Sequence, residues 1–137
     1  MSKASSIIDK MFLNDPFSQW LGIRRIEELP GSVTLELKVR KEMLNGFGIA
    51  HGGITYSLAD SALAFSANGH GIQSVSIETS VSHTKPVKEG DTLRTSVVEE
   101  SLTSKIGIYT VSIFNQKEEK VALFKGTVYR TGKEWED

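Results

Sequence analysis

Hydrophobic and polar residues alternate along much of this chain, and the pattern predicts a sheet of short strands. The clearest case is the segment 74–82, in which Val75, Ile77, Thr79 and Val81 alternate with serine and glutamate residues. Similar patterns bounded by turn residues predict further strands at 22–28, 32–40, 92–101, 106–115 and 121–130. Because the connections between successive strands are short, we expect antiparallel neighbours, with one face of the 22–40 hairpin in water.

Two other segments have the spacing of helices. Near the N-terminus this spacing covers 5–13 and predicts a short amphipathic helix on the surface, ended by a turn at Asn14-Asp15-Pro16. A longer helix is predicted over 53–68, because apolar residues recur at offsets of four, eight and eleven: Ile54, Leu58, Ala62 and Phe65.

The longer helix is almost free of charge. Asp60 is the only formally charged residue from Met43 to Ile77, and a helix with so little charge belongs inside the fold. One long buried helix and about six antiparallel strands predict an α+β domain in which the sheet wraps the helix, which is the hotdog architecture. We expect this single domain to span 1–137.

Charge and composition exclude several classes of function. Sixteen basic and seventeen acidic residues leave a net charge of -1, so no global basic field attracts nucleic acid or an anionic membrane. No apolar run reaches the length of a membrane span, and the charged N-terminal stretch does not resemble a signal peptide. The absence of cysteine excludes disulfides and thiolate metal sites and suits a reducing compartment. We therefore expect a cytoplasmic protein that binds neither nucleic acid nor membrane.

Both ends of the Gly52–Asp60 segment have properties that suit chemistry on a carbonyl group. The first backbone N–H groups of a helix have no intrahelical partner, so those at Gly52 and Gly53 would stabilise a carbonyl oxygen that gains negative charge. The alternative is a glycine pair needed for a tight turn. An ionised Asp60 in an uncharged helix is costly unless a function requires it, or unless it accepts hydrogen bonds from loop amides.

The spacing of Asn45, His51-Gly52-Gly53 and Asp60 resembles that of the PaaI-type thioesterases of the hotdog superfamily. The likeness extends through most of the chain and includes the segments 83–91 and 121–130. This resemblance implies hydrolysis of acyl-coenzyme A (acyl-CoA) thioesters to free acid and coenzyme A. It implies no separate cofactor, because coenzyme A is part of the substrate.

The same resemblance assigns roles to individual residues. It implies that Asn45 holds the attacking water or the carboxylate, that His51 orients the glycine loop or the thioester carbonyl, and that Ser76 positions water. Lys85 and Lys88 would lie near the phosphates of coenzyme A. Each has an ordinary alternative: an Asn-Gly turn, a helix-capping histidine, a polar residue on a serine-rich strand, and a solvated turn.

Helix geometry predicts that the site is shared between subunits. Seven residues at 1.5 Å each place Asp60 about 10 Å along the helix axis from Gly53, so one carbonyl group cannot contact both. If both serve one thioester, they come from different chains across a two-fold axis. We therefore expect a homodimer, and the resemblance implies a dimer of dimers.

Two mechanisms and two other functions stay open at this point. Asp60 either attacks the carbonyl carbon directly or acts as a general base on water, and burial should raise its pKa. A hotdog hydratase or dehydratase would need His51 and Asp60 to meet in space, and an acyl-CoA-binding regulatory module would bind without turnover. Met43, Phe47, Tyr56 and Phe65 are candidates for an apolar acyl pocket. The three histidines lack the spacing of a metal site, so no metal is expected.

Overall fold

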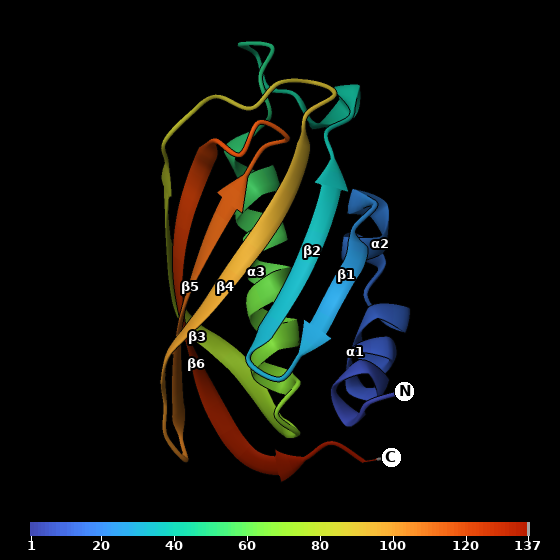
Figure 1. The fold of residues 1–137 in the computed structure, drawn as a ribbon, viewed down its shortest axis with the longest axis vertical. Helices are drawn as coiled ribbons and strands as arrows, with labels where there is room; N and C mark the ends of the chain where they lie inside the picture. The colour runs from blue at the N-terminus through green and yellow to red at the C-terminus, as the bar shows by residue number, and fades with distance from the viewer. Residues whose placement is uncertain (137) are drawn as a thin grey trace.

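A long helix at the centre of a curved sheet dominates the computed structural model, which describes residues 1–136 (Figure 1). Residue 137 of the predicted domain lies outside the described part. The central helix is α3 (Gly52–Asn68), and the six-stranded antiparallel sheet has the order β1-β2-β4-β5-β6-β3. Its strands are β1 (Arg24–Leu29), β2 (Ser32–Lys38), β3 (Ile72–His83), β4 (Thr92–Leu102), β5 (Ile106–Phe114) and β6 (Lys120–Glu134). The predicted α+β hotdog architecture is confirmed.

The core lies between α3 and the concave face of the sheet. Leu58, Ala59 and Ala62 of α3 are fully buried, and they belong to the same apolar cluster as Val111 and Phe124 of the strands. The low charge of this helix therefore corresponds to its central position. Within residues 1–136, no helix is long and apolar enough to cross a membrane.

The alternating segment predicted at 74–82 is confirmed as part of β3, which lies at the edge of the sheet. This strand pairs with β6 on one side only. Its apolar residues Val75 and Ile77 are 56% and 58% exposed, in contrast to the buried apolar positions of β2. The chain by itself thus leaves Val75 and Ile77 uncovered, whereas Val81 of the same alternating set packs against the core.

The N-terminal region contains one element more than the sequence pattern indicated. The first helix, α1 (Lys3–Leu13), begins two residues before the predicted start, with Ser2 as its N-cap. The helix ends at Leu13 and turns at Asn14 as predicted, but a second helix that the pattern did not indicate, α2 (Pro16–Leu21), follows directly. Asp15 caps this helix and Pro16 occupies its first turn, which is a common way for a helix to begin.

The first strand starts later than predicted, because α2 occupies the chain before it. Gly22 ends α2 in the left-handed conformation, with φ of 73°, so β1 begins at Arg24 instead of residue 22. Further on, β2 ends at Lys38, and a single 3₁₀ turn, η1 (Lys41–Met43), leads toward the loop before α3.

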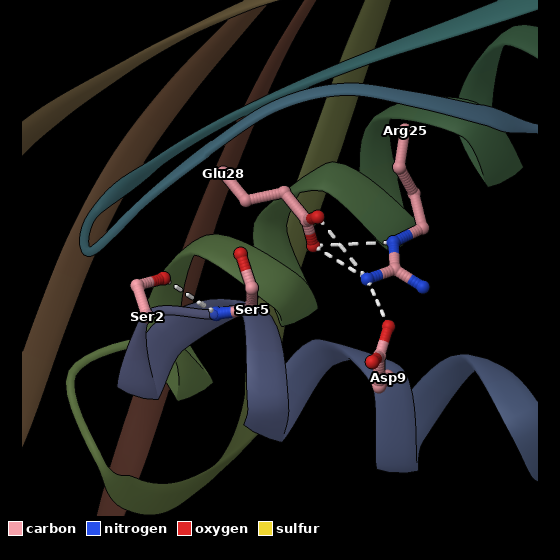
Figure 2. A network of polar contacts seen from close by, with 5 residues as sticks. All are labelled: Ser2, Ser5, Asp9, Arg25 and Glu28. Atoms are coloured by element: carbon pink, nitrogen blue, oxygen red, sulfur yellow. Dashed lines mark hydrogen bonds and ion pairs between the residues drawn. The ribbon is translucent and has the colours of Figure 1, made fainter.

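An ion-pair network holds α1 against the first strand. Arg25 of β1 pairs with Asp9 of α1 and with Glu28 at the end of the same strand, the latter at 2.9 Å (Figure 2). Figure 2 also shows the Ser2 hydroxyl accepting the Ser5 N–H at the start of α1, at 3.1 Å. The Arg25–Asp9 pair therefore ties α1 to β1, and Met11 of α1 borders the candidate site.

Candidate active site

The start of α3 is organised by His51, which is its N-cap. The Nδ1 atom of His51 accepts the Gly53 N–H at 2.9 Å, so this nitrogen carries no proton and the ring has its proton on Nε2. The Gly52 N–H has no hydrogen-bond partner among the described residues. In this conformation Gly52, more than Gly53, therefore presents a free amide at the positive end of the helix.

The Gly52 amide lies in a cavity of about 440 Å³ between the loop before α3 and the end of β3. Asn45, His83 and Lys85 line this cavity, together with Thr55 and Pro86. His83 stands directly against the glycine, because a Cβ at Gly52 would lie 3.1 Å from His83 Cε1. Glycine is needed here because the His83 ring approaches the backbone closely.

Asn45 fixes the loop that leads into α3. Its side-chain oxygen accepts the Phe47 N–H at 2.9 Å and the Ile49 N–H at 3.4 Å, and its backbone N–H donates to the Ile49 oxygen at 2.8 Å. These bonds form the Asn-Gly turn that was the ordinary alternative for this residue. Asn45 also borders the Gly52 cavity, whereas Asp60 does not line it.

Asp60 lies half-buried at the middle of α3 and faces two smaller cavities, of about 180 and 290 Å³. No ion pair or hydrogen bond involves its side chain among residues 1–136. Burial raises the pKa of Asp60 above its ordinary value, and the nearby negative charge of Asp15 raises it further. An unpaired carboxylate of raised pKa at a cavity wall is an effective base.

The glycine amides and the carboxylate open onto different cavities. His51 and Gly53 line a cavity of about 310 Å³ with Phe17 and Trp20 of α2, and Asp60 is not among its lining residues. Phe17 and Ser57 separate this cavity from one of the two that contain Asp60, since they line both. One chain therefore does not bring His51 and Asp60 together as the acid–base pair that a hydratase would need.

The remaining predicted residues fall into three environments. Ser76 on β3 lines one of the Asp60 cavities. Lys85 borders the Gly52 cavity and forms an ion pair with Glu119, while Lys88 belongs to an exposed turn in which its N–H donates to Asp91 at 2.9 Å. Only Ser76 of these three is therefore placed beside Asp60.

The four residues considered for an apolar acyl pocket do not form one surface. Phe47 is 90% exposed on the loop, and Tyr56 packs against Phe124 with ring centroids 5.6 Å apart. Met43 lines the Gly53 cavity and Phe65 lines an Asp60 cavity. The expectation that these four residues line one acyl pocket within a single chain is therefore wrong.

Two residues of the site region were missed in the sequence. Asp15 lines an Asp60 cavity, and Phe17 lines both that cavity and the one at Gly53. The Asp-Pro pair followed by Ser18 is a helix-start signal that would have indicated α2. The position of α2 against α3, however, results from contacts between segments more than 40 residues apart, such as the 2.8 Å hydrogen bond between Ser18 and Ser61.

Comparisons with known proteins extend the likeness over most of the chain. Residues 47–122 match the family model of the thioesterase superfamily. A protein of Archaeoglobus fulgidus is 37% identical over 93% of this chain and 82% of its own length. The acyl-coenzyme A thioesterase PaaI of Escherichia coli is 34% identical over 89% of this chain and 87% of its own length.

Solved structures are similar over the same extent. The structure of the E. coli PaaI protein superposes with a TM-score of 0.93 and 33% identity, covering 96% of each chain. A hypothetical thioesterase of Streptococcus pneumoniae, crystallised with coenzyme A, has a TM-score of 0.86 and 25% identity, over 92% of this chain and 98% of its own.

Proposed function

This chain belongs to the thioesterase superfamily, and on that premise we propose that it hydrolyses acyl-CoA thioesters to the free acid and coenzyme A. One observation carries the proposal: α3 has both a free Gly52 N–H at its start and an unpaired, half-buried Asp60 at its middle. The E. coli relative is named as an acyl-CoA thioesterase, and the S. pneumoniae structure holds coenzyme A. The proposed reaction needs no metal or separate cofactor.

In the proposed mechanism, the thioester carbonyl lies at the N-terminus of α3. Two donors lie there: the Gly52 N–H, which is free, and the Gly53 N–H, which donates to His51 Nδ1 at 2.9 Å. A carbonyl oxygen at this position gains stabilisation as negative charge develops on it. Rotation of the exposed His51 ring would release the Gly53 N–H as a second donor.

Asp60 supplies the second half of the reaction. Its carboxylate either attacks the carbonyl carbon, which expels the coenzyme A thiolate and forms an anhydride that water then hydrolyses, or removes a proton from a water molecule whose attack on that carbon expels the thiolate. Because the Asp60 cavities and the Gly53 cavity are distinct within one chain, we propose that Asp60 acts on the thioester bound at the helix start of a neighbouring subunit. Ser76 lines one cavity with Asp60, which supports the proposal that it holds the water.

The edge strand β3 supports a homodimer. Its outer side has no partner strand in this chain, and its apolar residues Val75 and Ile77 are more than half exposed. A two-fold axis beside β3 would join the two sheets and bring two α3 helices together. We propose further that two such dimers associate, and that the protein acts in the cytoplasm.

The test is release of free thiol from a panel of acetyl-, hexanoyl-, lauroyl-, phenylacetyl- and benzoyl-CoA. Wild type should hydrolyse at least one of these thioesters, and Asp60→Asn at equal folded concentration should lose most of kcat while still binding a non-hydrolysable analogue. If neither protein releases thiol but both bind acyl-CoA, the hydrolase proposal fails and a binding module replaces it.

A further inference from the structure

Asp15 is held rigidly at the start of α2, close to the proposed catalytic carboxylate. Its Oδ1 atom accepts the Ser18 N–H at 3.0 Å, and its Oδ2 atom accepts the Ser18 hydroxyl at 2.6 Å. Because the Ser18 hydroxyl donates to Asp15, the hydroxyl of Ser61 must donate to Ser18, at 2.8 Å. Ser18 is only 1% exposed, so this chain of bonds fixes α2 to the residue next to Asp60 in α3.

Asp15 and Asp60 also face the same space. Both line the cavity of about 180 Å³ between α2 and α3. No other residue that lines either Asp60 cavity is ionisable: α1 contributes Met11, β3 contributes Ser74, Val75 and Ser76, and β6 contributes Val128. No cation from these described elements therefore offsets the repulsion between the two carboxylates.

We propose that Asp15 is a positioning residue of the active site, whose fixed negative charge makes the Asp60 carboxylate a stronger base toward the reacting groups. This inference rests on the proposed function, because it concerns the same carboxylate. Burial is the larger cause of the raised pKa of Asp60, and the charge of Asp15 is the second cause. A base with a pKa closer to the working pH removes a proton more effectively, which gives the carboxylate pair a catalytic use.

The chain offers a substitution that removes the charge and keeps the helix start. Asparagine is about as good an N-cap as aspartate, so Asp15→Asn should fold like wild type, and Asp15→Ser gives a second neutral cap. The matched control is Asp9→Asn, which removes the same charge from α1. Asp9 pairs with Arg25 (Figure 2). It lines neither Asp60 cavity.

The measurement is the pH profile of kcat/KM for thioester hydrolysis by wild type and these variants. In Asp15→Asn and Asp15→Ser, the acidic limb should move to lower pH and the plateau should fall, because Asp60 becomes a weaker base. In Asp9→Asn, the acidic limb should stay at the wild-type position.

Three outcomes would overturn the inference. The limb of both Asp15 variants could coincide with that of wild type, the Asp9 control could move it equally, or the variants could lose kcat evenly across pH with a lower Tm. The first two would leave the proposed function intact if Asp60→Asn is inactive. Full activity of Asp60→Asn would instead refute the proposed function itself.

Discussion

At the scale of single residues, Asp60 shows a conflict between stability and function. Its pKa is raised above the ordinary value of 3.8, so the folded state holds the proton more tightly than the unfolded chain does. Between the ordinary and the raised pKa, the free energy of unfolding therefore falls as pH rises, and above the raised pKa the full penalty of the buried charge is present. At neutral pH this carboxylate destabilises the fold.

Asp60→Asn should consequently be more stable and less active than wild type. Removing the ionisable group abolishes the penalty, so we expect a higher Tm at pH 7 and a smaller difference from wild type as the pH falls toward 4. We expect kcat to fall by about 10²- to 10⁴-fold, the usual contribution of a general base. Thermal unfolding at several pH values and thiol release measure the two effects, and a lower Tm at pH 7 would contradict the account of Asp60.

His51 is expected to contribute to stability through its ring nitrogen. His51→Ala removes the acceptor of the Gly53 N–H and should reduce the free energy of unfolding by about 1 kcal/mol, the usual cost of losing an N-cap. His51→Asn offers a side-chain oxygen in its place and should recover most of that loss. Urea denaturation compares the two variants, and equal stability of His51→Ala and wild type would rule out the capping role.

At the scale of elements, the packing of α3 on β6 depends on a missing side chain. A Cβ at Gly126 of β6 would lie 2.5 Å from Leu63 Cδ2, in a core where Leu63 is 1% exposed. The helix and the strand therefore approach closely because this strand position is glycine.

Gly126→Ala should destabilise the protein by about 1–3 kcal/mol, since the added methyl group overpacks a tight core. The matched control is Gly46→Ala, because a Cβ at exposed Gly46 meets no atom within 4 Å. The control should change the free energy of unfolding by less than about 0.5 kcal/mol. Urea denaturation decides between them, and similar midpoints for the two variants would show that the core can relax around the methyl group.

Elements also show where the sequence pattern was sufficient. The period of two in 74–82 and the helical spacing in 53–68 predicted β3 and α3 correctly, because each pattern is kept over many residues. The six-residue helix α2 was missed, because so short a helix has no recurring apolar stripe and is indicated only by its Asp15-Pro16 start.

At the scale of the whole molecule, the proposed shared site makes a prediction about mixed subunits. Asp60→Asn and Gly53→Val would each disable one half of every site. After the two variants are unfolded and refolded together, random pairing should give intact sites in about a quarter of cases, and about a quarter of wild-type activity.

Each variant refolded alone is the control for this experiment and should stay inactive. Activity of the mixture no greater than that of the separate variants would contradict the shared site, because a site formed within one chain gains nothing from mixing.

A second check uses the edge strand: Ile77→Lys, which places a charge on exposed β3, should shift the mass in solution toward the monomer and reduce activity with it.

The local patterns of the sequence determined the strands, the central helix and the family resemblance, because periodicity and the spacing of Asn45, His51 and Asp60 are properties of neighbouring residues. Tertiary structure decided what surrounds those residues. In the folded chain the Gly53 N–H donates a hydrogen bond to His51, and Gly53 and Asp60 line separate cavities. Asp15 lines a cavity together with Asp60. These relations depend on how α2, α3 and β3 pack, and packing joins residues whose distance along the chain carries no information about their contact.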